Sequence, residues 1–424
     1  MTVEQLKIWN TNAFLLLVTS TIWGHYLSLP FGPTVYAFQV LFCAMIVVFI
    51  STLPEKNSTI NISKNVRRIF LLYFVWIAFS VLSLLWSSYL MDSFKALYYE
   101  FEELMLMFFC IVYITDIASL MRVFKVVVVN FFILIPILLR ECITGVHLSV
   151  SQGNNDRYGR NLYTPTGMMY GTNDMAVVLV LFLIVAICYL SSKKMYKTSF
   201  LIYVISAYIL YFTDSRSAMV GFLIVTIITI YGYFKKNIFV TSLLFVFLTL
   251  AFLIVLGSKK EGAIKYIQQI FHNVLSKQGS TETRFQMYKY AWNLFISSNG
   301  VGVGVGNAYR PMGMLLRYNQ QLLYNMNIFG ETSVGVHNFF LQVLSETGIA
   351  GFLSMAGFYV YTLINSIQVF IKKQDLLNLV PLTICIMFFC ASVGSSSIFN
   401  MRIIWLFFGI GLSVLNLLGK EMES

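Results

Sequence analysis

The 424-residue chain is 58% hydrophobic and only 11% charged, with a formal net charge of +11. Soluble domains carry roughly 25% charged residues, and a soluble fold has too little interior to bury this much apolar surface. The composition therefore excludes an ordinary soluble protein. It indicates an all-α protein whose helices use the lipid bilayer as their solvent.

Apolar runs long enough to cross a hydrocarbon core about 30 Å thick recur from end to end of the chain. They predict about twelve transmembrane helices in a single membrane domain, residues 1–424, with no separate soluble domain. The first run lacks a small-residue cleavage site, so we expect a permanent helix and not a signal peptide. The expected spans are 13–29, 34–53, 69–86, 97–115, 124–139, 174–191, 200–213, 217–234, 238–257, 347–370, 377–396 and 402–418.

Basic residues predict the orientation of these spans. Every loop that follows an even-numbered span contains lysine or arginine, so by the positive-inside rule these loops and both termini face the cytoplasm. The odd-numbered connections must then face outward. The cytoplasmic residues on which this prediction rests are Lys56, Lys64, Arg67, Arg68, Arg122, Lys125, Lys193, Lys194, Lys197, Lys235, Lys236, Lys372 and Lys373.

The largest outward connection, residues 258–346 between the ninth and tenth spans, carries eight basic and four acidic residues, a net charge of +4. One explanation is that long loops are exempt from the positive-inside rule. The other is an anion site, because arginine forks match pairs of phosphate oxygens. All four histidines, His25, His147, His272 and His337, also fall on the outer side or at outer helix ends, which places any proton chemistry outside the cytoplasm.

A short polar segment, TDSRSA at residues 213–218, separates the seventh and eighth spans. An arginine at membrane depth is costly unless it is paired or hydrated, so Arg216 is a candidate functional residue. The alternative is an ordinary short loop whose arginine reaches the lipid headgroups.

Two helices are expected inside the large external loop. Residues 262–277 have apolar side chains at helical spacing and should lie flat on the membrane. A second helix, at about 282–297, follows a Ser-Thr cap and places Arg284, Tyr288 and Trp292 on one face at i, i+4 steps. This face could stack a sugar on its aromatic rings while the guanidinium binds a phosphate. Alternatively, the aromatic rings pack internally and Arg284 is a solvated charge.

The same loop ends in two further motifs. Glycines alternate with valines at residues 300–306, a pattern that permits tight turns and close backbone approach but lacks the Gly-Lys-Ser/Thr continuation of a nucleotide P-loop. Residues 336–348, VHNFFLQVLSETG, lead into the tenth span, so His337 should project from a first helical turn, where an imidazole can hold or deprotonate a hydroxyl. A structural role for this histidine remains the alternative.

Charged residues in two other outward regions complete the candidate set. Arg157 and Arg160 lie in the connection of residues 140–173 and could reach the same anion. The three glutamates of the fourth span are expected near its outer end as simple counter-charges: Glu100, Glu102 and Glu103.

In combination, these motifs resemble the O-antigen ligase and O-antigen polymerase superfamily. The resemblance rests on TDSRSA at 213–218, Arg284 through Trp292, the glycine stretch, and the segment from His337 and Asn338 to Glu346. It implies a multi-helix glycosyltransferase that needs neither metal nor cofactor. It also implies a location in the bacterial cytoplasmic membrane with the active site facing outward.

Members of this superfamily take an undecaprenyl-diphosphate-linked glycan at the outer leaflet and transfer it to an acceptor hydroxyl. The acceptor is lipid A-core in the ligases and the terminal sugar of another lipid-linked unit in the polymerases. We favour a polymerase of O-antigen or capsule repeat units, with the ligase as the alternative. The expected partners are the lipid-linked glycan, an acceptor glycan or lipid A-core, membrane lipids and a chain-length regulator, and no nucleic acid.

The resemblance maps the motif arginines onto Arg216 and Arg284 and the motif histidine onto His337. Fixed cations aimed at a departing diphosphate stabilise the transition state, and an imidazole orients the attacking hydroxyl. We therefore predict these three residues as catalytic. The residues expected to bind the diphosphate or glycan are Arg157, Arg160, Tyr288, Trp292, Asn338 and Glu346.

A transporter or flippase for polysaccharide units is the alternative from another functional class. It predicts ionisable residues along a mid-membrane pathway and inverted repeats. The ionisable residues of this chain instead gather at the expected outer helix ends, and no repeat is visible, which favours an enzyme.

Overall fold

The computed structural model describes residues 3–29, 35–56, 61–155, 162–234, 278–310, 335–372, 374–395 and 398–423. Within these ranges the chain is helical apart from two strands of two residues each, β1 (Ser28–Leu29) and β2 (Val35–Tyr36). The helices are α1 (Val3–Trp23), η1 (Gly24–Tyr26), α2 (Ala37–Lys56), α3 (Lys64–Leu82), η2 (Ser83–Leu85), α4 (Leu90–Tyr113), α5 (Ile117–Thr144), η3 (Gln152–Asn155), α6 (Thr172–Ser192), α7 (Tyr196–Phe212), α8 (Arg216–Phe234), α11 (Gln278–Ser297), α14 (Phe339–Lys372), α15 (Leu376–Gly394) and α16 (Arg402–Glu423).

The predicted all-α polytopic membrane architecture is confirmed. Among the described residues, six helices are long and apolar enough to cross a membrane, and three shorter apolar helices accompany them. The helices α1 to α8 and α14 to α16 coincide with eleven of the expected spans. The remaining span, 238–257, and the expected surface helix, 262–277, lie outside the described residues.

Local capping residues set the ends of several helices. Asp116 begins α5 with a capping box, because its side chain accepts from the Ser119 amide while the Ser119 side chain accepts in return. Gly145 ends the same helix in the left-handed conformation, with φ of 67°. Asp375 begins α15 in a similar way by accepting from the amide of Asn378.

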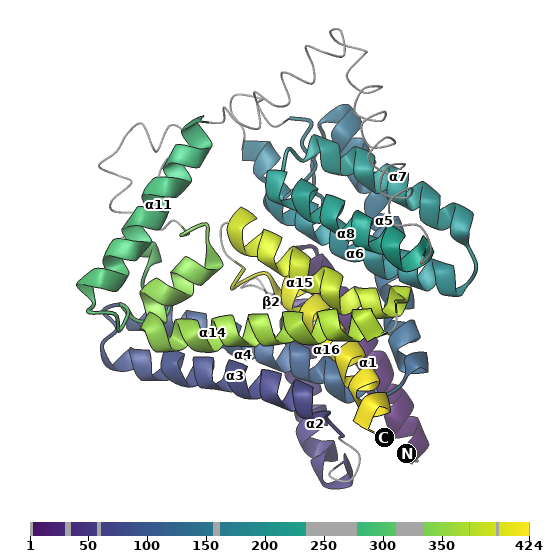
Figure 1. The fold of residues 1–424 in the computed structure, drawn as a ribbon, viewed down its shortest axis with the longest axis horizontal. Helices are drawn as coiled ribbons and strands as arrows, with labels where there is room; N and C mark the ends of the chain where they lie inside the picture. Colours follow the sequence, from purple (N-terminus) through teal and green to yellow (C-terminus); the bar gives the residue numbers. More distant parts are fainter. Residues whose placement is uncertain are drawn as a thin grey trace.

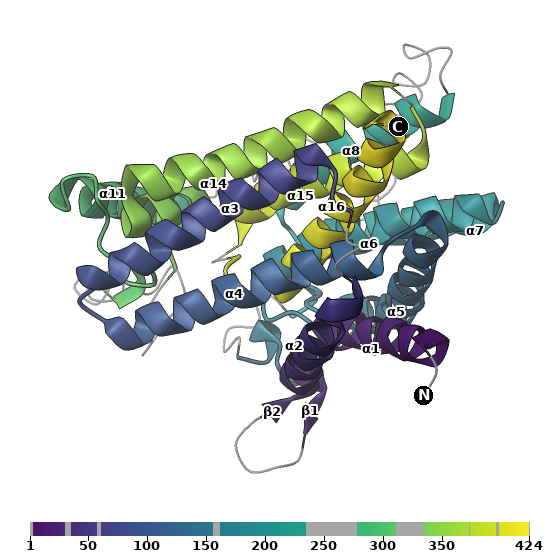
Figure 2. The same ribbon diagram turned by 90° about the horizontal axis from the view of Figure 1, so that it is seen from below.

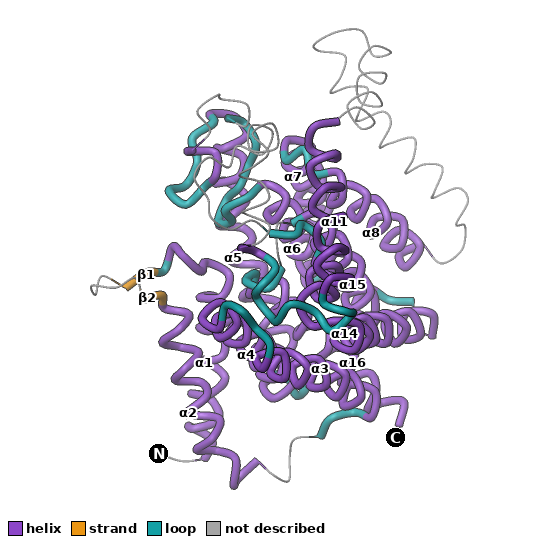
Figure 3. The backbone as a smooth tube through the Cα atoms, turned by 90° about the vertical axis from the view of Figure 1, so that its left-hand side faces the viewer, coloured by secondary structure: helices purple, strands orange, loops and turns teal. Residues whose placement is uncertain are grey.

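The helices pack into one bundle, as Figures 1 and 2 show. The long helix α14 lies along α3, α16 packs on α4, and α15 contacts α6, α8, α14 and α16. Both termini lie toward one end of the long axis, whereas α11 lies at the other end. The β1–β2 pair projects from the bundle beside α1 and α2 (Figure 3). This arrangement separates α11, which belongs to the large loop, from the chain ends.

The expected position of the α4 glutamates was wrong. Because α4 begins at Leu90, Glu100, Glu102 and Glu103 lie in the middle of the helix and are buried, with at most 1% exposure. Their partners are few among the described residues: Tyr73 donates to Glu103 (2.9 Å) and Ser80 to Glu100 (3.0 Å). Glu102 accepts from Arg402 Nε (2.7 Å), so it is a counter-charge as expected, but all three carboxyl groups lie in the packed interior and not at the surface.

Candidate active site

Arg284 joins the large external loop to the membrane bundle. It lies on α11, which packs on the start of α14 through a small apolar cluster that includes Met287 and Val336. The Arg284 guanidinium donates from Nη1 to the carbonyl oxygen of Val393 (3.3 Å) and from Nη2 to that of Gly394 (3.2 Å). These carbonyl groups belong to the last turn of α15, where the carbonyl oxygens have no N–H donor within the helix. Arg284 is therefore bound to the end of a helix and is not simply solvated.

Arg216 begins α8 beside the same helix end. The next residue, Ser217, lies against Gly394 so closely that a Cβ at the glycine would collide with the serine Oγ. Gly394 thus contacts α8 on one side and accepts the hydrogen bond of Arg284 on the other. The structure brings these two predicted arginines to one helix end although they are far apart in the sequence.

His337 lies next to Arg284 in an uncommon backbone conformation. Its φ is 56°, a left-handed value that costs free energy for a residue other than glycine and that clusters at functional sites. The Tyr288 hydroxyl donates to the His337 carbonyl oxygen over 3.1 Å, which holds this conformation. The buried Nδ1 atom of His337 has no hydrogen-bond partner among the described residues. In the tautomer that carries its proton on Nε2, this nitrogen is an acceptor in a site that has already been desolvated.

The imidazole of His337 is neutral at physiological pH. Burial, and secondarily the positive charge of Arg284, lower the pKa of His337 to about 4. The next residue, Asn338, has a structural role, because its Oδ1 accepts from the Leu341 amide (3.1 Å) as a cap of α14. A neutral imidazole with a free nitrogen can accept a hydrogen bond from a substrate hydroxyl.

The glycine-rich segment folds onto a break in α14. Gly348 interrupts that helix with φ of 69°, and Gly302 approaches it with φ of 88°. A Cβ at Gly302 would lie 2.6 Å from the amide nitrogen of Gly348, so neither position has room for a side chain. The amides of Val303 and Gly304 donate to the carbonyl groups of residues 345 and 346, each over 2.9 Å. Close backbone approach, and not phosphate binding, is thus the use of these glycines.

Glu346 fixes the end of the glycine-rich segment. One carboxylate oxygen accepts from the Gly306 amide (3.0 Å), and the other accepts from the Ala308 amide (3.3 Å) and from Gln342 Nε2 (3.3 Å). Glu346 also lines the cavity described next. Because both oxygens are already engaged, this residue positions the site and is not a free base.

A cavity of about 950 Å³ opens beside this cluster. Five of the six connections expected to face outward contribute to its lining, which supports their placement on one side of the bundle. Gly335 lines it two residues before His337, and Gln342 and Glu346 line it from α14. The cavity therefore borders the predicted catalytic group, although Arg216, Arg284 and His337 do not line it directly.

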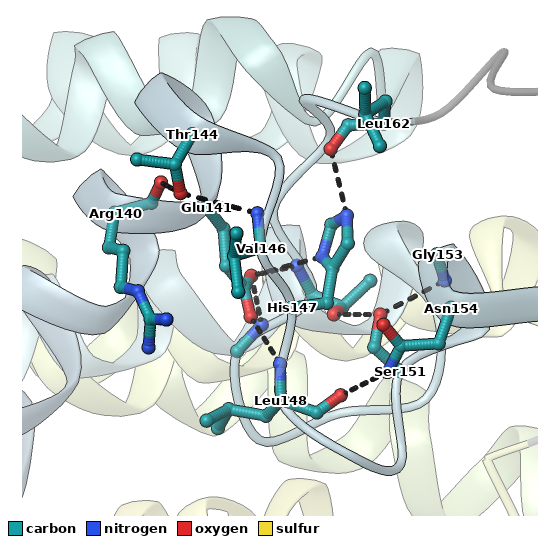
Figure 4. Close-up of polar contacts among 12 residues, drawn as sticks. Arg140, Glu141, Thr144, Val146, His147, Leu148, Ser151, Gly153, Asn154 and Leu162 are labelled. Atoms are coloured by element: carbon teal, nitrogen blue, oxygen red, sulfur yellow. Dashed lines mark hydrogen bonds and ion pairs between the residues drawn. The ribbon is translucent and has the colours of Figure 1, made fainter.

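Glu141 organises one wall of this cavity at the end of α5. Its Oε2 accepts from the amides of Thr166 (2.7 Å) and Gly167 (2.8 Å), and its Oε1 accepts from that of Leu148 (3.3 Å; Figure 4). Residues 168–170, which follow directly, line the cavity. A single buried carboxylate thus ties the returning loop to the bundle.

His147 completes this arrangement (Figure 4). Its Nε2 lies 2.9 Å from the Leu162 carbonyl oxygen, and its Nδ1 lies 3.7 Å from Glu141 Oε2. Because a carbonyl group only accepts, Nε2 carries a proton. His147 therefore has a structural role in the loop and is separate from the His337 cluster.

Three predicted binding residues are not part of the described cluster. Trp292 is 49% exposed and packs against Phe295, because two i, i+4 steps from Arg284 turn it partly around α11. Arg157 and Arg160 lie outside the described residues. Sequence reasoning also missed three cations that line the cavity: Lys95, Arg310 and Arg402. Only Arg310 had a signal in the sequence, namely the net positive charge of the large loop to which it belongs.

Comparison with known proteins supports the same region. Residues 201–356 match the O-Antigen ligase family, a range that includes Arg216, Arg284 and His337. The chain is also 22% identical over 376 residues to the teichuronic acid biosynthesis protein TuaE of Bacillus subtilis (strain 168). That alignment covers 85% of this chain and 74% of the relative. These similarities indicate a membrane glycan ligase or polymerase of polysaccharide biosynthesis. Since the family match covers the segments in which the predicted residues converge, both comparisons support the predicted resemblance to the O-antigen ligase and polymerase superfamily.

Proposed function

We propose that the protein polymerises surface polysaccharide by transferring a glycan from undecaprenyl diphosphate to an acceptor sugar at the outer face of the bacterial cytoplasmic membrane. One observation carries the proposal. Arg284 and the start of α8, which is Arg216, both lie at the end of α15, beside a neutral His337. Cations and a free acceptor nitrogen are the two groups that this reaction needs.

The proposed reaction is a displacement at the anomeric carbon of the donor sugar. The acceptor hydroxyl oxygen forms the new glycosidic bond while the bond to the diphosphate oxygen breaks, and the electron pair stays on the diphosphate. Arg216 and Arg284 stabilise the negative charge that develops there, so the chemistry needs no metal ion. The hydroxyl proton passes to His337 Nδ1 as the hydroxyl becomes acidic late in the reaction.

The known relative supports a polymerase over a ligase. Its name refers to the biosynthesis of teichuronic acid and not to lipopolysaccharide. An acceptor that is itself a growing glycan fits this role better than lipid A-core. An assay that supplies both a glycan acceptor and lipid A-core distinguishes the two activities, because a ligase would transfer the glycan to lipid A-core.

Alanine replacement of Arg216, Arg284 or His337, followed by gel analysis of surface glycan, tests the assignment in cells. We expect each variant to lose the long polymer at normal protein level, because removing one stabilising group costs about 10²–10³ in rate. Arg140, an exposed arginine at the outer end of α5, provides the matched control Arg140→Ala, which should retain the polymer. Full-length polymer in all three site variants would overturn the proposal.

A further inference from the structure

The cavity of about 950 Å³ has a lining that is both charged and electrically balanced. Among the described residues that line it, three are basic and three are acidic, so their formal charges cancel. These residues are Lys95, Arg310, Arg402, Asp92, Asp174 and Glu346.

Two of the cations are held in pairs. Arg310 and Asp92 form an ion pair at an exposed part of the wall, with side chains 48% and 30% exposed and Nη2 lying 3.2 Å from Oδ1. Arg402 Nε donates to the buried Glu102 over 2.7 Å, and its guanidinium lies over the Phe38 ring at 4.5 Å from the centroid. Both guanidinium groups therefore keep donors in fixed positions while their charge is already compensated.

This balance argues against a diphosphate or a lipid tail in the cavity. A diphosphate carries several negative charges and needs unpaired cations, whereas two of the three cations in the lining already form ion pairs, Arg310 with Asp92 and Arg402 with Glu102. A lipid tail would bury six ionisable side chains against hydrocarbon, which is costly. A sugar hydroxyl, in contrast, both donates and accepts, and this wall offers guanidinium donors beside carboxylate acceptors. Aromatic rings, among them Tyr99 and Tyr309, add apolar faces for the sugar ring.

The cavity also lies where an acceptor would have to lie. Gln342 on α14 donates to the Tyr309 hydroxyl over 2.7 Å, so the wall that carries Arg310 is tied to the helix that His337 precedes. Gly335 lines the cavity two residues before His337. A sugar in the cavity would thus lie beside the segment that leads into His337.

We propose that this cavity is the binding site for the terminal sugars of the acceptor glycan, with Arg310 and Asp92 as its specificity-determining residues. The proposal rests on the proposed glycosyl transfer. It assigns the acceptor to a site that is separate from the arginines of the diphosphate. Lys95, which is exposed and forms no hydrogen bond or ion pair to another side chain in the described part of the chain, offers one more donor to a sugar hydroxyl or carboxylate.

Thiol protection tests the site directly. Asn400 lines the cavity and is exposed, so Asn400→Cys in a Cys43→Ser background gives a reactive thiol there, since the other native cysteines are buried. The probe is an oligosaccharide of a few repeat units, released from the surface polysaccharide of the native host. We expect it to slow maleimide labelling of Asn400→Cys by about tenfold at saturation, and undecaprenyl diphosphate alone to leave labelling unchanged. The matched control is Ser88→Cys, an exposed residue of another outward connection that does not line the cavity, and its labelling should not respond.

Two outcomes would overturn the inference. Equal protection by undecaprenyl diphosphate alone would make the cavity the donor site, and no protection by the oligosaccharide would leave it without a sugar. Transfer by the wild-type protein, measured in the same preparation, separates these failures from that of the proposed function. A protein that transfers glycan but shows no protection contradicts only the acceptor site, whereas a protein that transfers nothing contradicts the function itself.

Kinetics of the ion pair give a second, independent readout. We expect Arg310→Gln and Asp92→Asn each to raise the KM for the oligosaccharide acceptor about tenfold, the worth of one hydrogen bond to a charged group. The KM for the lipid-linked donor should stay within about twofold. The exchange Asp92→Arg with Arg310→Asp restores the pair but reverses its polarity. Full recovery of the acceptor KM by this exchange would indicate a purely structural pair and contradict the proposal.

Discussion

The Tyr288 hydroxyl donates a hydrogen bond to the carbonyl oxygen of His337 across 3.1 Å. This bond ties α11 to a residue whose left-handed backbone would otherwise be unfavourable. We therefore expect Tyr288→Phe to lower kcat about tenfold, because a hydrogen bond of roughly 1 kcal/mol is lost and the imidazole is less well oriented. The KM values should change little. Tyr290→Phe, on the same helix and without a side-chain hydrogen bond among the described residues, is the matched control and should behave as wild type. An unchanged kcat in Tyr288→Phe would refute the positioning role.

The pH dependence of transfer should report the neutral imidazole. Since the pKa of His337 is lowered to about 4, first by burial and then by Arg284, the rate should fall only as the pH approaches 4 from above. Removing the positive charge in Arg284→Gln stabilises the protonated imidazole, so the acid limb of the residual rate should move upward toward 6.5, the ordinary value. The measurement is the single-turnover rate between pH 4 and 8 in both proteins. An acid limb that does not move would show that Arg284 and His337 are not coupled.

The glycine contacts at the break in α14 predict that alanine substitutions of different glycines will differ sharply in their cost to the stability of the folded protein. Gly302→Ala and Gly348→Ala place a Cβ into backbone atoms at positive φ, so each should cost at least about 1–3 kcal/mol and lower the amount of folded protein in the membrane. Gly357 lies on the same helix with ordinary contacts at 3.6 Å, so Gly357→Ala should be tolerated. Thermal unfolding in detergent, followed by tryptophan fluorescence, compares the three. Equal melting temperatures would contradict the described packing.

Glu141 should control the order of the loop that it binds (Figure 4). In Glu141→Gln the side chain keeps one acceptor oxygen, so at least one of the amides of Leu148, Thr166 and Gly167 loses its partner, at about 1–3 kcal/mol. We expect faster proteolysis within residues 145–171 and weaker binding of the acceptor oligosaccharide. Thr144→Val, which removes a hydroxyl bonded only to nearby backbone in the described contacts, is the control. A loop that stays protected in Glu141→Gln would contradict this role.

The orientation predicted from charge can be tested by labelling intact cells. Lys194, in the turn between α6 and α7, should face the cytoplasm, and Ser88, between α3 and α4, should face outward. A membrane-impermeant maleimide should therefore label Ser88→Cys in intact cells, but Lys194→Cys only after permeabilisation. The reverse pattern would put the candidate active site inside the cell.

The sequence alone predicts the helices well, but it predicts only part of the candidate site. Long apolar runs make helices almost unavoidable in a bilayer, and eleven expected spans coincide with described helices. The i, i+4 spacing of Arg284 and Tyr288 likewise survives in α11, because local periodicity depends only on the helix itself. Trp292 lies two such steps after Arg284 and is 49% exposed, since an α-helix rotates slightly with each i, i+4 step.

Contacts between distant segments could not be read from a single sequence. Arg402 pairs with Glu102 across 300 positions and Arg310 with Asp92 across 218, and neither pair has a local signature. The mid-helix position of Glu100 also removes one argument against a transporter, because that argument placed the ionisable residues only at helix ends. A transfer assay with purified protein is therefore the observation that separates the enzyme from the transporter.

The most direct measurement uses the purified protein in lipid nanodiscs with an undecaprenyl-diphosphate-linked repeat unit and a metal chelator. Released undecaprenyl diphosphate and lengthened glycan are both followed by mass spectrometry. Glycosyl transfer by the Arg284 and His337 cluster predicts equal amounts of the two products from the wild type, and rates lower by at least about a hundredfold in Arg284→Ala and His337→Ala. A wild-type protein that produces neither product, or a His337→Ala variant as fast as wild type, would contradict the central claim.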